Sequence, residues 1–246
     1  MDKISIANNF TQNFTDISST EESYAIATPI QINHQAVEYI RPETLPLDNF
    51  WNALLKRGFD IIVSIILIVC ILSWLIPLLA IIIKLNSRGP VFFLQKRNKN
   101  GGLLFTCIKF RSMFVNNEAD TLVASENDAR ITSVGKFIRK YHIDELPQLI
   151  NVLIGDMSLI GPRPHMVSEN IKYENLLHEY DCRHAIKPGI TGLAQSLGNF
   201  GSSNLEQVKE RVRLDIEYIN KWSLILDIKI LCRTSLSMLG FMKLNK

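Results

Sequence analysis

The stretch IIVSIILIVCILSWLIPLLAIII, residues 61–83, decides the fold, because it contains no charged side chain. A helix needs about 20 apolar residues to cross the hydrocarbon core of a bilayer, and this stretch is long enough. A buried core helix is the alternative, but helices in globular cores are seldom this long and apolar on every side. The sequence therefore predicts a helix embedded in a membrane.

The centre and the flanks of this stretch argue against a simple crossing. Ser73 and Pro77 interrupt it, and a proline removes a backbone hydrogen bond and bends a helix. Lys56 and Arg57 precede it. Further basic residues follow it: Lys84, Arg88, Lys96, Arg97 and Lys99. Cytoplasmic flanks carry the excess of Lys and Arg, and here both flanks are basic. We therefore predict a re-entrant helix over residues 51–88, bent near Ser73 and Pro77, that enters and leaves by one face.

The composition limits the classes of protein to consider. The chain has 246 residues, of which 47% are hydrophobic, and its net charge is only +3, which argues against nucleic-acid binding. Four scattered cysteines form no CxxC pair, so neither a disulfide framework nor a zinc site is indicated. Residues 1–50 are polar and are expected to form a flexible extension without a cleavable signal peptide. Within them, IATPIQI (26–32) is a candidate strand.

The region after the apolar stretch begins with a predicted β-hairpin. PVFFLQKR (90–97) and LLFTCIKF (103–110) flank the turn NKNGG (98–102). Lys109 and Arg111 lie two residues apart, so on a strand they point the same way. Such a pair forms either a solvated face or a phosphate-binding clamp.

DELPQLINVLIG (144–155) reads as a helix with apolar residues at helical spacing and a glycine stop. Asp144 and Glu145 stand at its start, where the unpaired backbone N–H groups and the helix dipole stabilise a negative charge. The same pair is also a candidate catalytic group. Four basic residues precede it closely: Arg130, Lys136, Arg139 and Lys140.

Two further segments have the composition of ligand-binding loops. In GDMSLIGPRPHM (155–166), Pro162 and Pro164 fix the backbone around Arg163, whose guanidinium suits a phosphate or a uracil-type carbonyl edge. KPGITGLAQSLGNFGSS (187–203) is glycine-rich, which lets backbone approach a ligand closely. The last segment (205–244) is amphipathic and then apolar, and it forms either a helix lying in the headgroup region or a core helix.

Several motifs in order resemble the bacterial sugar transferases, the monotopic polyprenyl-phosphate sugar-1-phosphate transferases. They are KRGFDIIVS, GPVFFLQKR, CIKFRSM, NDARIT, GKFIRK, IDELPQL, GDMSLIGPRP and KPGITGLAQ, between Lys56 and Asp227. The resemblance implies a mainly α fold with a short β-hairpin (α+β). It further implies a re-entrant membrane helix, interfacial amphipathic helices and a catalytic core (89–246) on the cytoplasmic side of the inner membrane.

The resemblance also implies a reaction. A UDP-sugar gives its sugar-1-phosphate to undecaprenyl phosphate, which yields undecaprenyl-diphosphate-sugar and UMP and initiates surface polysaccharide synthesis. The expected partners are these two substrates, the lipid bilayer and downstream glycosyltransferases.

Matching positions assign roles to individual residues. Asp144 corresponds to a nucleophile that forms an aspartyl-phosphate, and Glu145 corresponds to a ligand of Mg²⁺. Further positions correspond to phosphate or nucleotide contacts: Lys109, Arg111, Arg139, Pro162, Arg163 and Pro164.

One departure from the family pattern stands near residue 200. Family members commonly have ITGWAQVNG followed by an Arg, whereas here Leu193 replaces the Trp and Asn199-Phe200 stand where the Arg is expected. Lys187 is the candidate substitute for that cation. The departure leaves an alternative open, a membrane-tethered nucleotide-sugar-binding or assembly module without turnover. A soluble nucleotide-binding protein is a third alternative.

Overall fold

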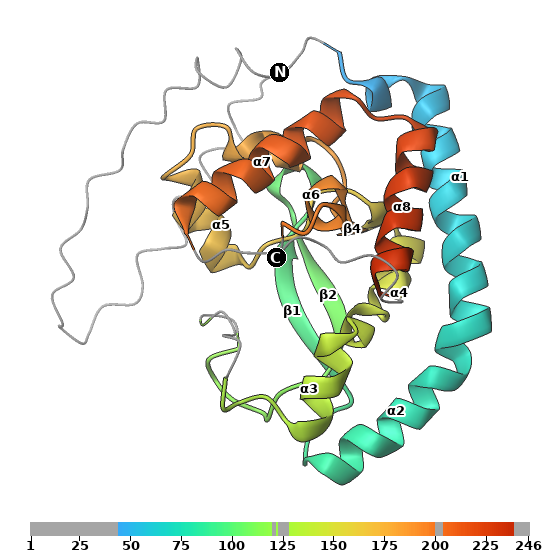
Figure 1. Cartoon of the computed structure of the whole chain (residues 1–246), viewed down its shortest axis with the longest axis vertical. Coiled ribbons are helices and arrows are strands. Elements are labelled where there is room, and N and C mark those ends of the chain that lie inside the picture. The colour runs from blue at the N-terminus through green and yellow to red at the C-terminus, as the bar shows by residue number, and fades with distance from the viewer. Residues whose placement is uncertain (1–43, 120–121, 123–127, 200–203, 239–246) are drawn as a thin grey trace, which may run out of the picture. The chain divides into compact units, whose positions relative to one another are not determined.

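The computed structural model describes residues 44–119, 122, 128–199 and 204–238 (Figure 1). Most of the predicted extension, with the strand proposed at 26–32, therefore lies outside the described residues. The described part is mainly helical and contains two small sheets, in agreement with the predicted α+β class. The helices are α1 (Phe50–Leu67), α2 (Ser73–Asn86), α3 (Ser133–Lys140), α4 (Gln148–Ile154), α5 (Val167–Glu174), α6 (Leu193–Ser196), α7 (Leu205–Asn220) and α8 (Leu224–Met238). The strands are β1 (Phe92–Asn98), β2 (Leu104–Phe110), β3 (Ser158–Ile160) and β4 (Gly189–Thr191).

The apolar stretch forms a helix of 37 residues, Phe50–Asn86, the one helix among the described residues that is long and apolar enough to cross a membrane. Its middle, Ile68–Leu72, is a π-helical turn in which the Ser73 N–H donates to the Ile68 carbonyl, five residues back. Figure 1 shows that α1 and α2 run in different directions on either side of this turn. A break is therefore present, and it lies immediately before Ser73.

Side chains within the break satisfy two backbone carbonyls. The Ser73 hydroxyl donates to the Val69 carbonyl (2.7 Å), and the Trp74 indole N–H donates to the Cys70 carbonyl (2.9 Å). Pro77 lies inside α2 and has no N–H to offer to the preceding turn. In an apolar environment an unpaired carbonyl is costly, so these bonds make the break tolerable there.

Helix α1 carries its polar residues on the buried face. Lys56, Asp60 and Ser64 follow one another at intervals of four residues and are all buried. Apolar residues such as Trp51 and Ile62 are instead exposed, at 71% and 60%. This is the inverse of a helix on the surface of a soluble protein, and it suits a helix whose outer face contacts lipid.

Lys56 docks α1 onto the rest of the chain. Its ammonium donates to the Asp227 carboxylate of α8 (2.8 Å), the Ile160 carbonyl (3.0 Å) and the Tyr218 hydroxyl (3.1 Å). The Asp227 carboxylate also accepts from Tyr218 (2.7 Å) and from the Trp222 indole N–H (3.1 Å). Each group of this buried ion pair is thus bonded several times, as a charge out of water requires.

Two more side chains extend this dock. The Arg57 guanidinium donates to the Val152 carbonyl (2.6 Å) and the Leu153 carbonyl (2.9 Å) near the C-terminal end of α4. The helix dipole stabilises a cation at that end. The Asp60 carboxylate accepts from the Leu159 N–H (3.1 Å). The interpretation of Lys56 and Arg57 as flanking charges was therefore incomplete, because both are bound to the core.

The predicted hairpin is confirmed. Strands β1 and β2 pair antiparallel, with Phe93 opposite Lys109. Gly101 and Gly102 in the turn have φ of 69° and 72°, a conformation that favours glycine. Phe110, at the end of β2, packs with Leu79 and other buried residues of α2, so the hairpin is fixed to the apolar helix.

A second sheet was not predicted. Strands β3 and β4 pair in parallel, with Ser158 opposite Gly189. A Cβ on Gly189 would lie 2.1 Å from the Gly161 nitrogen, so the close approach of the two chains requires glycine there. Gly189 belongs to the loop that the sequence analysis interpreted as ligand-binding. In the structure it instead allows the backbone of β4 to pack closely against the backbone at Gly161.

The C-terminal helix α8 packs against the core, as one of the two interpretations predicted, and its placement in the headgroup region stays a prediction. Ile230 of α8 is buried, and Leu226 packs against the same core cluster. On the other hand, Ile225 is 67% exposed, and Ile228 and Leu236 are also exposed. One side of α8 is a core helix face, and other positions present an apolar surface.

We expect Lys56→Met to destabilise the protein strongly, because it leaves the Asp227 carboxylate buried without its cation. Breaking a buried pair by removing one partner costs about 3–5 kcal/mol. The measurement is the free energy of unfolding in detergent, with Lys209→Met as the control. The exposed Lys209–Glu206 ion pair (2.8 Å) contributes less than about 1 kcal/mol to stability. The double variant Lys56→Met/Asp227→Asn should be more stable than Lys56→Met, and equal stability of Lys56→Met and the control would contradict the dock.

Candidate active site

A cavity of about 470 Å³ lies between the β-hairpin, the segment before α4 and the Pro-Arg-Pro turn. This volume falls within the range of small-molecule sites, about 300–1,000 Å³. Among the described residues, six cationic side chains line it: Arg97, Lys109, Arg111, Arg139, Arg163 and Arg211. Three carboxylates of the described residues line it as well: Asp144, Glu145 and Glu169. The lining therefore has a formal excess of three positive charges.

Asp144 and Glu145 lie in a 3₁₀ turn, Ile143–Glu145, rather than in the first turn of α4. His142 precedes this turn with φ of 54°, a left-handed conformation that redirects the chain. Pro147 is the N-cap of α4, and it makes no side-chain capping bond. The capping interpretation of the two carboxylates is therefore wrong, whereas the stop at Gly155 (φ 99°) is confirmed.

Glu145 is held by two cations. Lys109 Nζ lies 2.7 Å from its Oε1, and the Arg163 guanidinium donates to Oε2 (2.8 Å) and Oε1 (2.5 Å). Burial would raise the pKa of Glu145, but Arg163 and Lys109 outweigh it and hold that pKa well below its usual value. Glu145 is thus a fixed anion.

Asp144 is in a different electrostatic position, although it is just as buried, with 7% exposed. Burial and the neighbouring Glu145 raise the pKa of Asp144 to about 6, against the opposite effect of Lys109, Arg139 and Arg163. At neutral pH Asp144 is therefore mostly ionised and poorly solvated. A carboxylate in this state is suited to act as a nucleophile, whereas Glu145 is neutralised by its partners.

The structure brings most of the predicted residues to one place. Lys109, Arg139, Arg163 and Pro164 line the cavity together with the two carboxylates, and Arg139 donates to the Ser112 hydroxyl (3.4 Å). Pro162 supports the turn from behind, since its carbonyl accepts from the Gly189 N–H (2.9 Å). Of the four basic residues upstream of Asp144, Arg139 is the one that lines the cavity.

Arg111 and Lys109 do not form one clamp. Arg111 follows the end of β2, and its guanidinium donates to the Arg88 carbonyl (2.5 Å) and the Ser87 carbonyl (2.7 Å). It therefore ties the end of α2 to the hairpin, although it also lines the cavity.

Lys187 does not line this cavity. It lies beside Arg57 and Gly155, at the C-terminal end of α4, whereas Asp144 precedes the N-terminal end of that helix. Burial and the neighbouring Arg57 lower the pKa of Lys187. Lys187 lies there because it leads into β4, whose pairing with β3 fixes its backbone. The interpretation of Lys187 as the substitute cation in the cavity is therefore not supported by its position.

Among the cavity residues that sequence reasoning did not identify are Gln95, Arg97, His165 and Arg211. Arg97 donates to the Pro164 carbonyl (2.8 Å) and to the Gln95 side chain (3.0 Å). A signal was available, because Gln95 and Arg97 stand two residues apart on β1. In the observed register they share a face with Lys109.

A buried polar network supports the Pro-Arg-Pro turn from below. The Arg183 guanidinium donates to the Arg163 carbonyl (2.7 Å) and to the Asp215 carboxylate (2.8 Å). His165 lies between Arg211, 2.8 Å from its Nε2, and the Tyr180 hydroxyl, 2.5 Å from its Nδ1. Burial and the surrounding arginines hold the pKa of His165 well below its usual value, so the ring is neutral.

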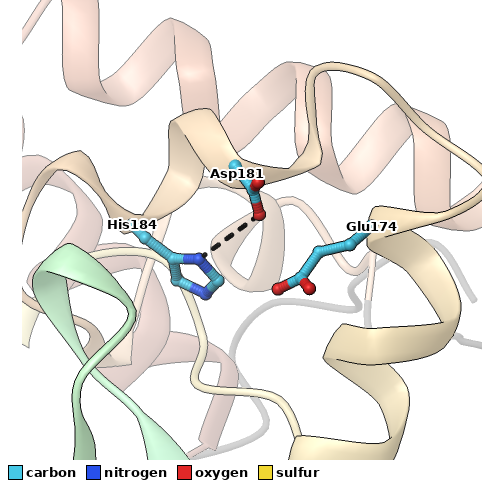
Figure 2. A group of neighbouring side chains, drawn as sticks. All are labelled: Glu174, Asp181 and His184. Atoms are coloured by element: carbon cyan, nitrogen blue, oxygen red, sulfur yellow. Dashed lines mark ion pairs between the residues drawn. The ribbon is translucent and has the colours of Figure 1, made fainter. Parts of the chain in front are cut away.

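A separate group of three side chains of the kinds that bind metal ions lies outside the cavity. Figure 2 shows Glu174 of α5 and two residues of the turn Tyr180–Ala185, Asp181 and His184, pointing toward one another. Their potential ligand atoms lie within 4.8 Å of one another. The predicted magnesium ligand, Glu145, is not part of this group.

The apolar helix with its inward polar face indicates a membrane-associated protein, and the positive excess of the cavity lining favours anionic ligands. The family model described as bacterial sugar transferase matches residues 51–240. The chain belongs to this family.

The names of individual relatives are consistent with this family. A Xanthomonas campestris protein named UDP-glucose:undecaprenyl-phosphate glucose-1-phosphate transferase is 42% identical over 213 residues, 85% of this chain and 44% of that protein. A Caulobacter vibrioides protein of the same name is 42% identical over 79% of this chain and 73% of its own length. An Aeromonas hydrophila protein is 43% identical over 74% of this chain and 43% of its own length. It is named UDP-N-acetylgalactosamine-undecaprenyl-phosphate N-acetylgalactosaminephosphotransferase. The chain thus spans less than half of the first and third of these proteins.

We expect the free energy of unfolding to fall as the pH is lowered from 7.5 to 5.5. His165 takes up a proton below about pH 6.5 in the unfolded chain but stays neutral in the folded one, which costs up to about 1.4 kcal/mol per pH unit. Unfolding of the protein and of His165→Gln at several pH values measures the effect. The variant should show the shallower decline, and parallel curves would contradict a neutral buried His165.

Proposed function

We propose that the protein transfers a sugar-1-phosphate from a UDP-sugar to undecaprenyl phosphate, giving undecaprenyl-diphosphate-sugar and UMP, and so initiates a surface polysaccharide. The observation that carries this proposal is the unlike pair of carboxylates, Asp144 with its raised pKa and Glu145 clamped by cations, in one cationic cavity. The names of the relatives support the substrates, and they make UDP-glucose the first donor to test.

The proposed chemistry proceeds in two displacements at the phosphorus that bears the sugar. A carboxylate oxygen of Asp144 attacks this phosphorus, and the bond to the oxygen bridging the two phosphates breaks, so UMP leaves with the electron pair. An oxygen of the lipid phosphate then attacks the same phosphorus. The bond to Asp144 breaks, and its carboxylate is restored.

Lys109 and Arg163 supply the charge stabilisation for these steps. In the free protein both cations are bound to Glu145, at 2.7 Å and 2.5–2.8 Å. A bound diphosphate offers further oxygens to the same two cations. These cations then partly neutralise the negative charge of the diphosphate, which reduces its repulsion of the attacking Asp144 carboxylate.

The two carboxylates themselves offer oxygen ligands of the kind that Mg²⁺ binds. Mg²⁺ in proteins is usually held by one or two carboxylates together with substrate phosphates and waters. Glu145 Oε2 accepts one hydrogen bond among the described residues, from Arg163, so a lone pair remains for a metal. Glu145 is the proposed ligand, and the ion would offset the charge of the diphosphate.

We further propose that the helix Phe50–Asn86 is re-entrant, with the core on the cytoplasmic face of the inner membrane, where UDP-sugars are made. The support is that both ends of the helix bind the same core. Lys56 and Arg57 are bound near its start, and the Ser87 and Arg88 carbonyls are bound by Arg111 after its end. A straight crossing would place these contacts on opposite sides of the bilayer.

Asp144→Asn should abolish transfer, because an amide is not a nucleophile toward phosphorus; loss of a covalent nucleophile costs roughly 10⁴-fold or more. Glu145→Gln and a chelator should also reduce the rate severely. The assay is UMP release from UDP-glucose, and then from other UDP-sugars, in the presence of undecaprenyl phosphate, with Lys209→Met as the control. Near-normal turnover of Asp144→Asn would refute the covalent mechanism. Absence of UMP release by the unaltered protein with every donor would favour the module without turnover.

Topology can be tested by labelling cysteines with an impermeant thiol reagent. Thr44→Cys precedes the helix and Leu103→Cys (62% exposed) follows it, in a background where the exposed Cys70 and Cys232 are serine. Both new cysteines should be protected in intact cells and should react once the membrane is opened. Labelling of Thr44→Cys alone in intact cells would rule out the re-entrant arrangement.

A further inference from the structure

The polar network below the Pro-Arg-Pro turn contains an ion pair that stability alone does not explain. Arg183 and Asp215 are each 2% exposed, and their charged groups lie 2.8 Å apart. Removing two charges from water can cost more than their attraction returns, and well-packed apolar residues in place of such a pair are often as stable or more so. The geometry of the pair indicates what else it does.

The proton on His165 can be placed from its neighbours. The Tyr180 hydroxyl donates its single proton to the side-chain oxygen of Asn170 (2.6 Å). The proton in the 2.5 Å contact between this hydroxyl and His165 Nδ1 therefore belongs to Nδ1, and Nε2 of the neutral ring accepts from Arg211 (2.8 Å). Because Nδ1 is protonated, Arg183 Nη1 donates to the Tyr180 hydroxyl (3.1 Å) and not to the ring.

Three successive carbonyls of the Pro-Arg-Pro turn are held by three different parts of the chain. The Pro162 carbonyl accepts from a backbone N–H of β4 (2.9 Å), and the Pro164 carbonyl accepts from Arg97 of β1 (2.8 Å). The Arg163 carbonyl between them accepts from Arg183 Nη2 (2.7 Å). The proline rings already fix φ at two of these positions, so the three bonds restrict most of the freedom that remains.

Arg183 is itself anchored on both of its terminal nitrogens. Nη2 also donates to the Asp215 carboxylate of α7, and Nη1 donates to the Tyr180 hydroxyl, as described above. A guanidinium is planar and rigid, so bonds on both nitrogens fix its direction. The bond from Arg183 to the Arg163 carbonyl therefore ties the turn to α7 in one orientation.

The Arg163 side chain depends on this backbone for its own direction. Its guanidinium donates to both oxygens of Glu145, a two-bond geometry that tolerates little displacement. The Arg163 side chain is nevertheless 30% exposed, so packing does not confine it on every side. The position of its backbone is thus what aims the guanidinium at Glu145.

We propose that Arg183, held by Asp215, is a positioning residue for the transfer reaction. It fixes the Arg163 carbonyl and thereby aligns the Arg163 guanidinium with Glu145 beside Asp144. Arg183 acts through Arg163 and touches neither the paired carboxylates nor a substrate. This inference rests on the proposed function.

Substitutions of Arg183 test the proposal in the full chain in detergent. A displacement of about 1 Å can cost about 100-fold in rate, so Arg183→Met should lower kcat/KM for UMP release from UDP-glucose by about 10-fold to 100-fold. Arg183→Lys keeps the cation beside Asp215 and should recover part of that loss. Tyr180→Phe is the matched control, because it removes a hydroxyl of the same network but leaves both bonds of Arg183 Nη2. It should keep near-normal turnover, and an equal loss in Tyr180→Phe would contradict the specific role of Arg183.

A double-mutant cycle separates positioning from a merely structural role. Arg163→Lys keeps a cation near Glu145 but loses the two-bond geometry. If Arg183 acts through that geometry, Arg183→Lys should lower kcat/KM in the otherwise unaltered protein but change it little in the Arg163→Lys background, because residues that act through one interaction are not additive. Losses that multiply in the double variant would overturn the proposal.

Hydrogen exchange of the turn needs no turnover and separates this inference from the proposed function. The backbone amides of residues 161–166 should exchange faster in Arg183→Met than in Tyr180→Phe, and Arg183→Lys replaces Arg183→Met if unfolding curves show that the latter does not fold. Unchanged exchange in a folded Arg183 variant would overturn the positioning role even if the unaltered protein is active. If exchange rises as expected but the unaltered protein releases UMP from no UDP-sugar, Arg183 positions the turn and the transfer reaction fails.

Discussion

The ion pair between Lys56 and Asp227 is the interaction on which the rest of the structure depends. A helix with an apolar outer face can attach to a polar core only through its opposite face, so that face must carry polar groups. Lys56 provides the attachment, since its ammonium bonds to α8, to the end of β3 and to Tyr218 of α7 at 2.8–3.1 Å. Segments more than a hundred residues apart in sequence therefore meet at one buried charge.

The same dock determines where the carboxylates lie. Arg57, next to Lys56, binds the Val152 and Leu153 carbonyls of α4, a helix of seven residues. The turn that carries Asp144 and Glu145 lies immediately before the other end of α4. One short rigid helix thus links the apolar helix to the paired carboxylates. Arg111, bound to the end of α2, fixes the hairpin that brings Lys109 to Glu145.

The features that could be predicted from the sequence have local causes. The hairpin follows from two strand patterns around a glycine turn, and the end of α4 follows from Gly155. Features with distant causes were missed: the β3–β4 pair, and Arg97 and Arg211, which converge from β1 and α7. Lys56 and Arg57 were counted as flanking charges because the positive-inside rule considers the number of basic residues and not their burial. Lys187 was misplaced for a similar reason, since its position depends on the pairing of β4 with β3.

The departures from the family pattern near residue 200 now have a structural context. Leu193 packs against the hydrophobic core cluster, and the Asn199 N–H donates to the Ala194 carbonyl (3.0 Å). Neither residue lines the cavity in the described part of the chain, whereas Asp144, Glu145, Lys109, Arg139 and Arg163 all do. An apolar residue in place of Trp at 193 therefore changes packing behind the site rather than its charge. Leu193 and Asn199 thus lie away from the groups that the transfer chemistry needs, and Phe200 lies outside the described residues.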